Sequence, residues 1–275
     1  MKPRIAIVAQ RWAPEMVGGS EALAWQYAEL LSEDFEVDLL TSTALDYITW
    51  QNALPEGAER VGGVTVRRFA TAFARSEYFF TLDRKVRADW ATSGTTSERA
   101  ARFWTTALQE EVIKFQGPWC PGLFAHLDAH ADDYKAVVLT TYLYPTSYFA
   151  ACRFDAKKLL MAPTLHDEPM AHLPVYQRYR ERIARFLWLT NAERNLASRL
   201  WGVEQGNVIG MTIDAATAKP ESMPYPYLLY CGRIDALKGV DQLLAWFALY
   251  RAARPDRRFP FGRSASMHPV ATLAA

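Results

Sequence analysis

The sequence has few cysteines and no excess charge of either sign. Its three cysteines, Cys120, Cys152 and Cys231, are far apart, and no Cys-x-x-Cys pair occurs. This spacing suggests neither a zinc ribbon nor a disulfide framework, and a reducing cytosol is the simplest compartment. The 31 Lys and Arg residues nearly cancel the 30 Asp and Glu residues. A near-neutral chain gives no argument for nucleic-acid binding.

Long apolar runs are also missing. No stretch of about 20 uninterrupted apolar residues occurs, so no transmembrane helix is expected. The apolar run that follows the basic residues at the start is too short for a signal peptide. We therefore expect a cytoplasmic protein, and peripheral contact with the inner face of the membrane stays open because aromatic and basic residues are frequent. Half of the 275 residues are hydrophobic, so a sizeable core is expected, in one or two domains.

Short apolar runs alternate with helical stretches along the chain. Residues 4–9 read as a buried strand, residues 21–31 as a helix capped by Ser20, and residues 35–41 as the next strand. A strand–helix–strand unit indicates a parallel sheet. Further strands are predicted at residues 64–69, 136–140, 158–162, 186–190 and 208–211, and further helices at residues 98–115, 175–185, 192–200 and 240–253. The pattern predicts a Rossmann-like, doubly wound α/β domain.

A proline-rich stretch divides the chain into two predicted domains. Residues 214–226 contain three prolines and read as an interdomain linker. Residues 1–213 would form the N-terminal domain, and residues 227–275 would form a partial second Rossmann-like domain. Only one strand–helix unit is clear in the second part, and a single unit cannot cover its own apolar face. We therefore predict an incomplete second domain.

Two glycine-containing turns precede predicted helices. Gly18 and Gly19 let backbone N–H groups approach an anion at a helix N-terminus, although glycine pairs are also common in plain turns. Near the second turn, Arg233 and Lys238 are suited to a pyrophosphate, because a guanidinium fork and an ammonium can both bind its oxygens. The pattern Gly-x-Gly-x-x-Gly is absent, which lowers the odds of an NAD enzyme.

Two segments together resemble a known family. Ile5-Ala-Ile-Val8 with Gly18-Gly-Ser-Glu21 resembles the first strand and glycine loop of the family 4 (group 1) glycosyltransferases. Tyr230-Cys-Gly-Arg-Ile-Asp235 with Lys238-Gly-Val-Asp241 resembles their Gly-Arg-x4-Lys-Gly motif. The resemblance reaches about Pro255. It implies a two-domain (GT-B) transferase that moves a sugar, with retention, from a nucleotide diphosphate sugar to a saccharide or lipid-linked acceptor.

The resemblance also implies roles for individual residues. Gly18, Gly19, Arg233 and Lys238 would bind the donor diphosphate. No cofactor or catalytic metal is implied, and the oligomeric state stays open.

The acceptor side is predicted from residues that follow strands. His166, Asp167 and Glu168 come after the strand at residues 158–162, and ligands bind at the carboxyl ends of strands in open α/β folds. His166 and Glu168 could position or deprotonate an acceptor hydroxyl, which makes them the candidate catalytic residues. Asp167 is placed on the acceptor side with three further residues, Glu21, Tyr142 and Tyr144. Core packing of the two tyrosines is an equally open alternative.

Two features argue against parts of this assignment. His126 and His130 have the i, i+4 spacing of a helical metal pair, but no third ligand is evident, so a solvated helix face is expected. Family relatives carry a Glu-x7-Glu motif in the second domain, whereas this chain has no glutamate after Glu221. The alternative function is therefore a truncated, non-catalytic chain that acts at most as a binding or partner module.

Overall fold

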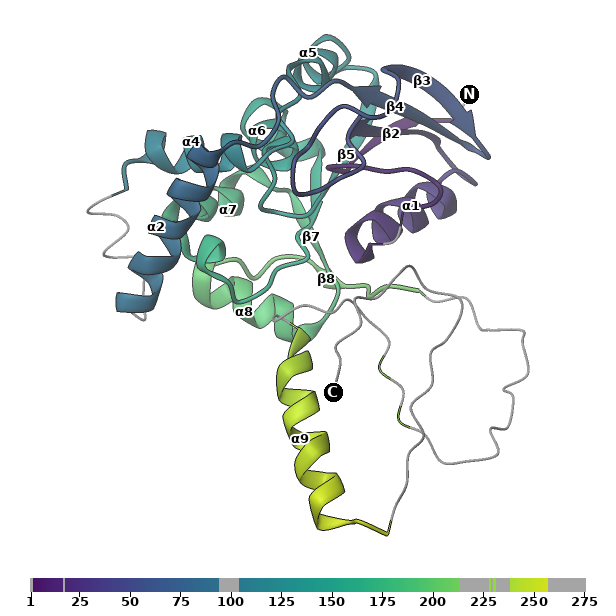
Figure 1. The fold of residues 1–275 in the computed structure, drawn as a ribbon. Helices are drawn as coiled ribbons and strands as arrows, with labels where there is room; N and C mark the ends of the chain where they lie inside the picture. The colour runs from purple at the N-terminus through teal and green to yellow at the C-terminus, as the bar shows by residue number, and fades with distance from the viewer. Residues whose placement is uncertain are drawn as a thin grey trace. The chain divides into compact units, whose positions relative to one another are not determined.

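The computed structural model describes residues 2–16, 18–93, 104–212, 228, 230 and 238–256, without the side chains of residues 92 and 93. The chain divides into two compact units, Met1–Ile213 and Asp214–Ala275, and Figure 1 shows the described helices and strands of both. Each unit is described by itself below.

The first unit is built on one eight-stranded sheet (Figure 1). The strands are β1 Arg4–Val8, β2 Glu36–Ser42, β3 Gly57–Val61, β4 Val64–Phe69, β5 Tyr134–Thr140, β6 Leu159–Ala162, β7 Arg185–Trp188 and β8 Asn207–Val208. Their order is β3-β4-β2-β1-β5-β6-β7-β8. Every pairing is parallel except that of β3 with β4. The mostly parallel α/β sheet confirms the predicted fold class of the first domain.

Helices cover both faces of this sheet. They are α1 Gly19–Leu31, α2 Glu77–Ser93, α4 Thr106–Gln116, α5 Pro121–Ala129, α6 Pro145–Arg153, α7 Tyr179–Arg182 and α8 Asn191–Trp201, with 3-10 turns at Ala156–Lys158, Pro169–His172 and Pro174–Arg178. Alternate residues of β1 enter different cores. Ile5 and Ile7 join the smaller core under α1, whereas Ala6 and Val8 join the larger core with α4, α5 and α6. The alternation follows from the two-residue period of a strand.

Three sequence predictions about helices were wrong in detail. The N-cap of α1 is Gly18 rather than Ser20, because the backbone of Gly18 is extended and the helix already begins at Gly19. Helix α4 begins at Thr106, since the Thr105 side chain caps it by accepting a bond from the Leu108 N–H. Residues 98–103 of the helix predicted at 98–115 lie outside the described residues. The stretch 175–185 forms a 3-10 turn, the one-turn helix α7 and the start of β7 instead of one helix.

The described part of the second unit contains helix α9, Val240–Ala253, at the predicted bounds. Gly239 caps it with φ of 67°, a left-handed conformation that favours glycine. Several large apolar side chains of α9 are exposed, among them Trp246 and Leu249. The predicted linker 214–226 and most of the predicted partial domain lie outside the described residues.

Candidate functional site

The carboxyl ends of β1 and β5 form the topological switch point of the sheet. From β1 the chain first adds β2 on one side and later adds β5 on the other. Gln10 and Arg11 follow β1, Thr141 and Tyr142 follow β5, and α1 begins above them. Ligands of open α/β sheets bind at such a point. The residues described next converge there.

The Glu21 carboxylate is the centre of one polar cluster. It accepts hydrogen bonds from Arg11 Nε at 2.7 Å, the Ser20 hydroxyl at 2.8 Å and Gln10 Nε2 at 3.2 Å. Glu21 is 4% exposed, and its pairing with Arg11 stabilises the buried charge. The other amide atom of Gln10, Oε1, is buried without a hydrogen-bond partner. Arg11 also donates to the Leu45 carbonyl oxygen, which ties the loop after β2 to this cluster.

Gly18 is needed because the Glu21 carboxylate lies against it. A Cβ atom on Gly18 would fall 2.2 Å from Glu21 Oε2, whereas a Cβ on Gly19 would meet nothing within 4 Å. The two glycines therefore differ: Gly18 allows a close approach within the chain, and Gly19 leaves open space. The Glu21 carboxylate takes up the space beside Gly18. Contact of Gly18 and Gly19 with the donor diphosphate stays a prediction.

A second cluster joins Tyr142 to Glu168. The Tyr142 hydroxyl donates to Glu168 Oε1 at 2.8 Å, and the ring is fully buried between Tyr176 and Trp201. Burial raises the pKa of Tyr142 well above its ordinary value, and the negative charge of Glu168 adds to the rise. Tyr142 thus stays a hydrogen-bond donor that holds Glu168 in one orientation at the carboxyl edge.

Tyr144 lies beside both clusters. Its ring packs edge-on against Trp50, with centroids 5.5 Å apart, and Trp50 donates from Nε1 to the Gln116 carbonyl at 2.7 Å. Burial raises the pKa of Tyr144 to about 12, and Glu21 contributes to the rise. The hydroxyl is therefore protonated, and no hydrogen bond joins it to another described residue. Arg75 also binds the Gln116 carbonyl, which holds this support in place.

The loop after β6 exposes the remaining predicted acceptor residues. His166 and Asp167 are both exposed, and Glu168 is partly buried. Asp167 pairs with His172 at 2.7 Å. The buried carboxylate of Glu193 supports the loop by accepting the N–H of Leu165 at 2.8 Å. The structure thus brings Glu168 and Tyr142 together, and it leaves His166 facing solvent with no side-chain hydrogen bond to a described residue.

Two strained threonines mark the same edge, and sequence reasoning missed them. Thr141 has φ of 65° and Thr164 has φ of 50°, a left-handed backbone that β-branched residues rarely adopt. They follow β5 and β6, and Thr164 donates to the Thr141 hydroxyl at 3.2 Å. Strained residues of this kind cluster at functional sites. A run of threonines after a strand gives no sequence signal for this conformation.

The predicted donor residues of the second unit are only partly described. Arg233 lies outside the described residues. Lys238 is exposed and directly precedes Gly239, the N-cap of α9. The pairing of Arg233 with Lys238 on a diphosphate therefore stays a prediction.

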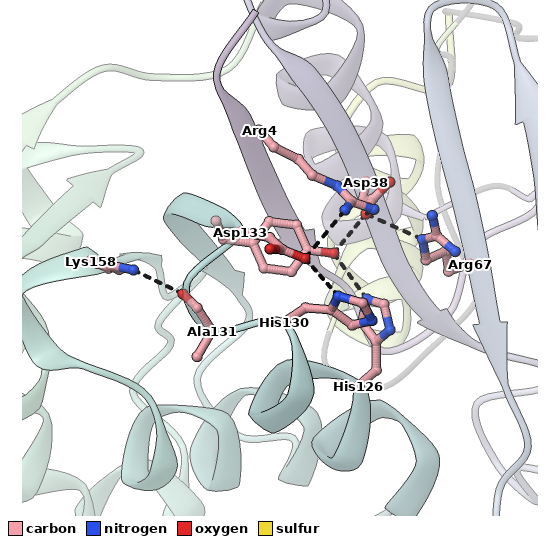
Figure 2. A network of polar contacts seen from close by, with 9 residues as sticks. Arg4, Asp38, Arg67, His126, His130, Ala131, Asp133 and Lys158 are labelled. Carbon is pink, nitrogen blue, oxygen red and sulfur yellow. Dashed lines mark hydrogen bonds and ion pairs between the residues drawn. The ribbon is translucent and has the colours of Figure 1, made fainter.

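The amino edge of the sheet carries a separate polar network, which Figure 2 shows. Asp38 accepts bonds from Arg4 Nη2 at 2.6 Å, Arg67 Nε at 3.2 Å and the Tyr134 hydroxyl at 2.6 Å. His126 Nε2 lies 2.9 Å from the Tyr134 hydroxyl. Because that hydroxyl gives its proton to Asp38, Nε2 of His126 is the donor.

The sequence predicted that His126 lies on a solvated helix face. That prediction was wrong, because the side chain belongs to this network. The side chain is partly buried, and burial lowers its pKa to about 4, with further lowering by His130 and Arg67. Within the described ranges, no three His, Cys, Asp or Glu side chains are placed to bind one metal ion. No helix among these residues has the length and apolar character to cross a membrane.

Comparison with known proteins gives structural likenesses only. No family model matches the sequence, and no curated protein matches it. A sucrose-phosphate synthase from Thermosynechococcus elongatus is 14% identical, with a TM-score of 0.41, over 77% of this chain and 90% of that one. A UDP-forming alpha,alpha-trehalose-phosphate synthase from Burkholderia vietnamiensis is 12% identical, with a TM-score of 0.36, over 73% of this chain and 42% of that one.

A third solved structure is of the same kind. An alpha,alpha-trehalose 6-phosphate synthase from Burkholderia multivorans is 12% identical, with a TM-score of 0.38, over 72% of this chain and 43% of that one. This chain thus spans less than half the length of either trehalose-phosphate synthase chain. With TM-scores below 0.5, these are partial likenesses, and the function is argued below from the residues of this chain.

Proposed function

We propose that this chain belongs to a glycosyltransferase of the two-domain type, which transfers a sugar from a nucleotide diphosphate sugar to a hydroxyl group of a saccharide or lipid-linked acceptor with retention. The observation that carries the proposal is the Tyr142–Glu168 hydrogen bond of 2.8 Å at the carboxyl edge of the sheet. A carboxylate fixed by a buried donor can hold an acceptor hydroxyl in the orientation that attack requires.

Other residues of the edge fit the same reaction. The protonated Tyr144 hydroxyl can donate to an acceptor oxygen, and His166 faces solvent on the loop that carries Glu168. In the proposed reaction Arg233 and Lys238 bind the leaving diphosphate, where cations stabilise the charge that develops as the glycosidic bond breaks. No metal takes part in this scheme.

The test compares donor consumption in three forms of the full chain. Release of UDP or GDP would be measured from a panel of sugar nucleotides, with methyl glycosides as acceptors. Glu168→Gln keeps the size of the side chain but removes its charge, so we expect about a hundredfold loss of turnover, within the range for a positioned acid or base. Glu204→Gln, which changes an exposed carboxylate after α8, is the matched control and should keep most of the activity. Equal turnover in all three forms would contradict the role of Glu168.

The second candidate function is a non-catalytic binding module. The exposed apolar side chains of α9, among them Trp246 and Leu249, favour it, because a partner surface could cover them. Isothermal titration with UDP and GDP separates the two functions. Heat with either nucleotide that disappears in Lys238→Ala supports the transferase, whereas no heat with both nucleotides supports the binding module.

A further inference from the structure

A shallow cavity lies beside Glu21 on the side of helix α1. Its volume is about 270 Å³, just below the ~300 Å³ at which pockets for drug-sized ligands begin, and so it suits a single sugar unit. The lining includes Trp12, Pro14, Met16, Glu21, Trp25 and Val61. Trp12 and Trp25 stack on each other with ring centroids 4.3 Å apart.

The charges around this cavity are one-sided. Glu21 is the only charged residue among the described residues that line it. Arg11 turns its Nε to Glu21 and its Nη1 to the Leu45 carbonyl, so these donors are already used. The pairing with Arg11 offsets much of the Glu21 charge, but Arg11 does not line the cavity, so the described lining offers an incoming phosphate no cation.

Glu21 gives the cavity a hydrogen-bond acceptor. Glu21 lines the cavity, and its carboxylate, which has about four acceptor sites, accepts three hydrogen bonds from within the chain. Sugar hydroxyls can donate to the acceptor site that is left. An ionised diphosphate has no proton to donate. The cluster therefore selects a neutral polyol over an anion.

The aromatic lining of the cavity suits the apolar faces of a sugar ring. A pyranose ring presents C–H groups on its faces, and these bury apolar area against an indole ring. Trp25 is partly buried and packs on Trp12, which is held in the core beneath α1. Trp25 is thus a rigid surface next to a carboxylate, the two kinds of contact that a sugar needs.

We propose that the cavity formed by Trp12, Trp25 and Glu21 binds a neutral sugar unit and excludes the donor diphosphate. This inference rests on the proposed function, since it names the part of the substrate that the loop before α1 and the first turns of α1 contact. The diphosphate is then left to the second unit.

The test follows the nine tryptophans of the full chain by ¹⁹F NMR after labelling with 5-fluorotryptophan, with signals assigned by single Trp→Phe variants. The probes are methyl glycosides of glucose, galactose, mannose and N-acetylglucosamine, with inorganic pyrophosphate as the anion. We expect at least one glycoside to shift the Trp12 and Trp25 signals, while Trp119 stays still. Pyrophosphate should shift neither Trp12 nor Trp25.

Single substitutions test whether the ¹⁹F shifts of Trp12 and Trp25 come from a glycoside bound in the cavity. Glu21→Gln should weaken glycoside binding about tenfold, because a hydrogen bond to a charged group is lost. Glu29→Gln changes an exposed carboxylate of the same helix and should leave binding unchanged. Trp25→Ala provides a second test that does not alter the polar cluster, and circular dichroism checks that each variant folds.

The outcomes separate this inference from the proposed function. Nucleotide heat by titration, without any glycoside shift, would overturn the sugar cavity and keep the transferase. Glycoside shifts without nucleotide heat would support the cavity and count against the transferase. Pyrophosphate shifts at Trp12 and Trp25 as large as those of the glycosides would overturn the exclusion of the anion, and no shift with any probe would overturn the sugar cavity.

Discussion

Each of the two edges of the central sheet has a buried carboxylate that accepts three hydrogen bonds, and the two surroundings differ in whether the neighbouring polar atoms have partners. Asp38 at the amino edge and Glu21 at the carboxyl edge are 3% and 4% exposed, and each accepts three hydrogen bonds. Around Asp38 the contacts continue through Tyr134 to His126. Around Glu21, Gln10 Oε1 has no partner.

The difference between the two edges indicates which of them binds a ligand. Most buried polar groups are satisfied, so a group without a partner asks for an explanation. The side chains around Asp38 bond to one another, and this network therefore stabilises the fold. The carboxyl edge keeps an unpaired acceptor, an available Tyr144 hydroxyl and two strained threonines, Thr141 and Thr164. This difference assigns stability to one edge and function to the other.

The largest effect is expected from breaking the amino edge. Asp38→Ala leaves Arg4, Arg67 and the Tyr134 hydroxyl without their shared acceptor, which should lower the free energy of unfolding by about 2–4 kcal/mol. The two arginines are 26% and 30% exposed, so water limits the loss. Urea unfolding of the full chain measures it. Asp34→Ala, at an exposed carboxylate, should change stability by less than about 0.5 kcal/mol, and equal losses in both variants would contradict the special role of Asp38.

A smaller effect on stability is expected from the protonation of His126 at the same edge. The pKa of His126 falls from 6.5 to about 4 on folding, so between these values the unfolded chain binds more protons than the folded one. Stability should therefore rise with pH across this window and be lost as pH falls through it. After allowance for solvent screening at this partly exposed ring, His126 contributes about 1–2 kcal/mol to the change in the free energy of unfolding across this window.

The pH effect is measured by unfolding at pH 4.5 and 7.5. His126→Gln should show a smaller difference between the two pH values than the parent, because its side chain does not titrate. The account of this edge fails if His126→Gln and the parent lose the same stability in acid.

The smallest effects on stability are expected from substitutions of two tyrosines at the carboxyl edge. Tyr142→Phe removes the bond to Glu168 and should lower the free energy of unfolding by about 1 kcal/mol. Tyr144→Phe removes no bond within the described chain and should change stability by less than about 0.5 kcal/mol, yet it should weaken binding of the methyl glycosides. Thermal unfolding and glycoside titration measure the pair. A stability loss in Tyr144→Phe with unchanged binding would show that Tyr144 packs in the core and does not bind ligand.

The buried parts of the fold could be predicted from sequence because burial leaves a pattern. The apolar runs of β1, β5 and β6 agree with the structure. The bounds of α9 also agree, although Val240 is the one buried residue of that described helix. The edge strand β3, Gly57–Val61, has almost no buried residue, so no hydrophobic pattern marks it. No helix is predicted over α2, because its sequence is polar and mixed. In the stretch 175–185, local 3-10 turns and the start of β7 outweigh a helical pattern.

The candidate site was predictable only by position along the chain. Residues after strands, such as Tyr142 and Glu168, could be expected at one edge, but their hydrogen bond depends on tertiary packing. Trp12 and Trp25 lie 13 positions apart and gave no motif, and their stacking follows only from the path of the loop before α1. The pairing of Arg11 with Glu21 was missed for the same reason.

The most direct test of the difference between the edges is a ¹⁵N NMR titration of the full chain with the methyl glycoside panel. The account predicts that at least one glycoside shifts backbone amides at the carboxyl edge, namely Gly18, Gly19, Thr141 and Thr164. The amides of Arg4, Asp38 and Tyr134 at the amino edge should stay unmoved. Shifts centred on the Asp38 network, or no shift at the carboxyl edge with any glycoside, would contradict it.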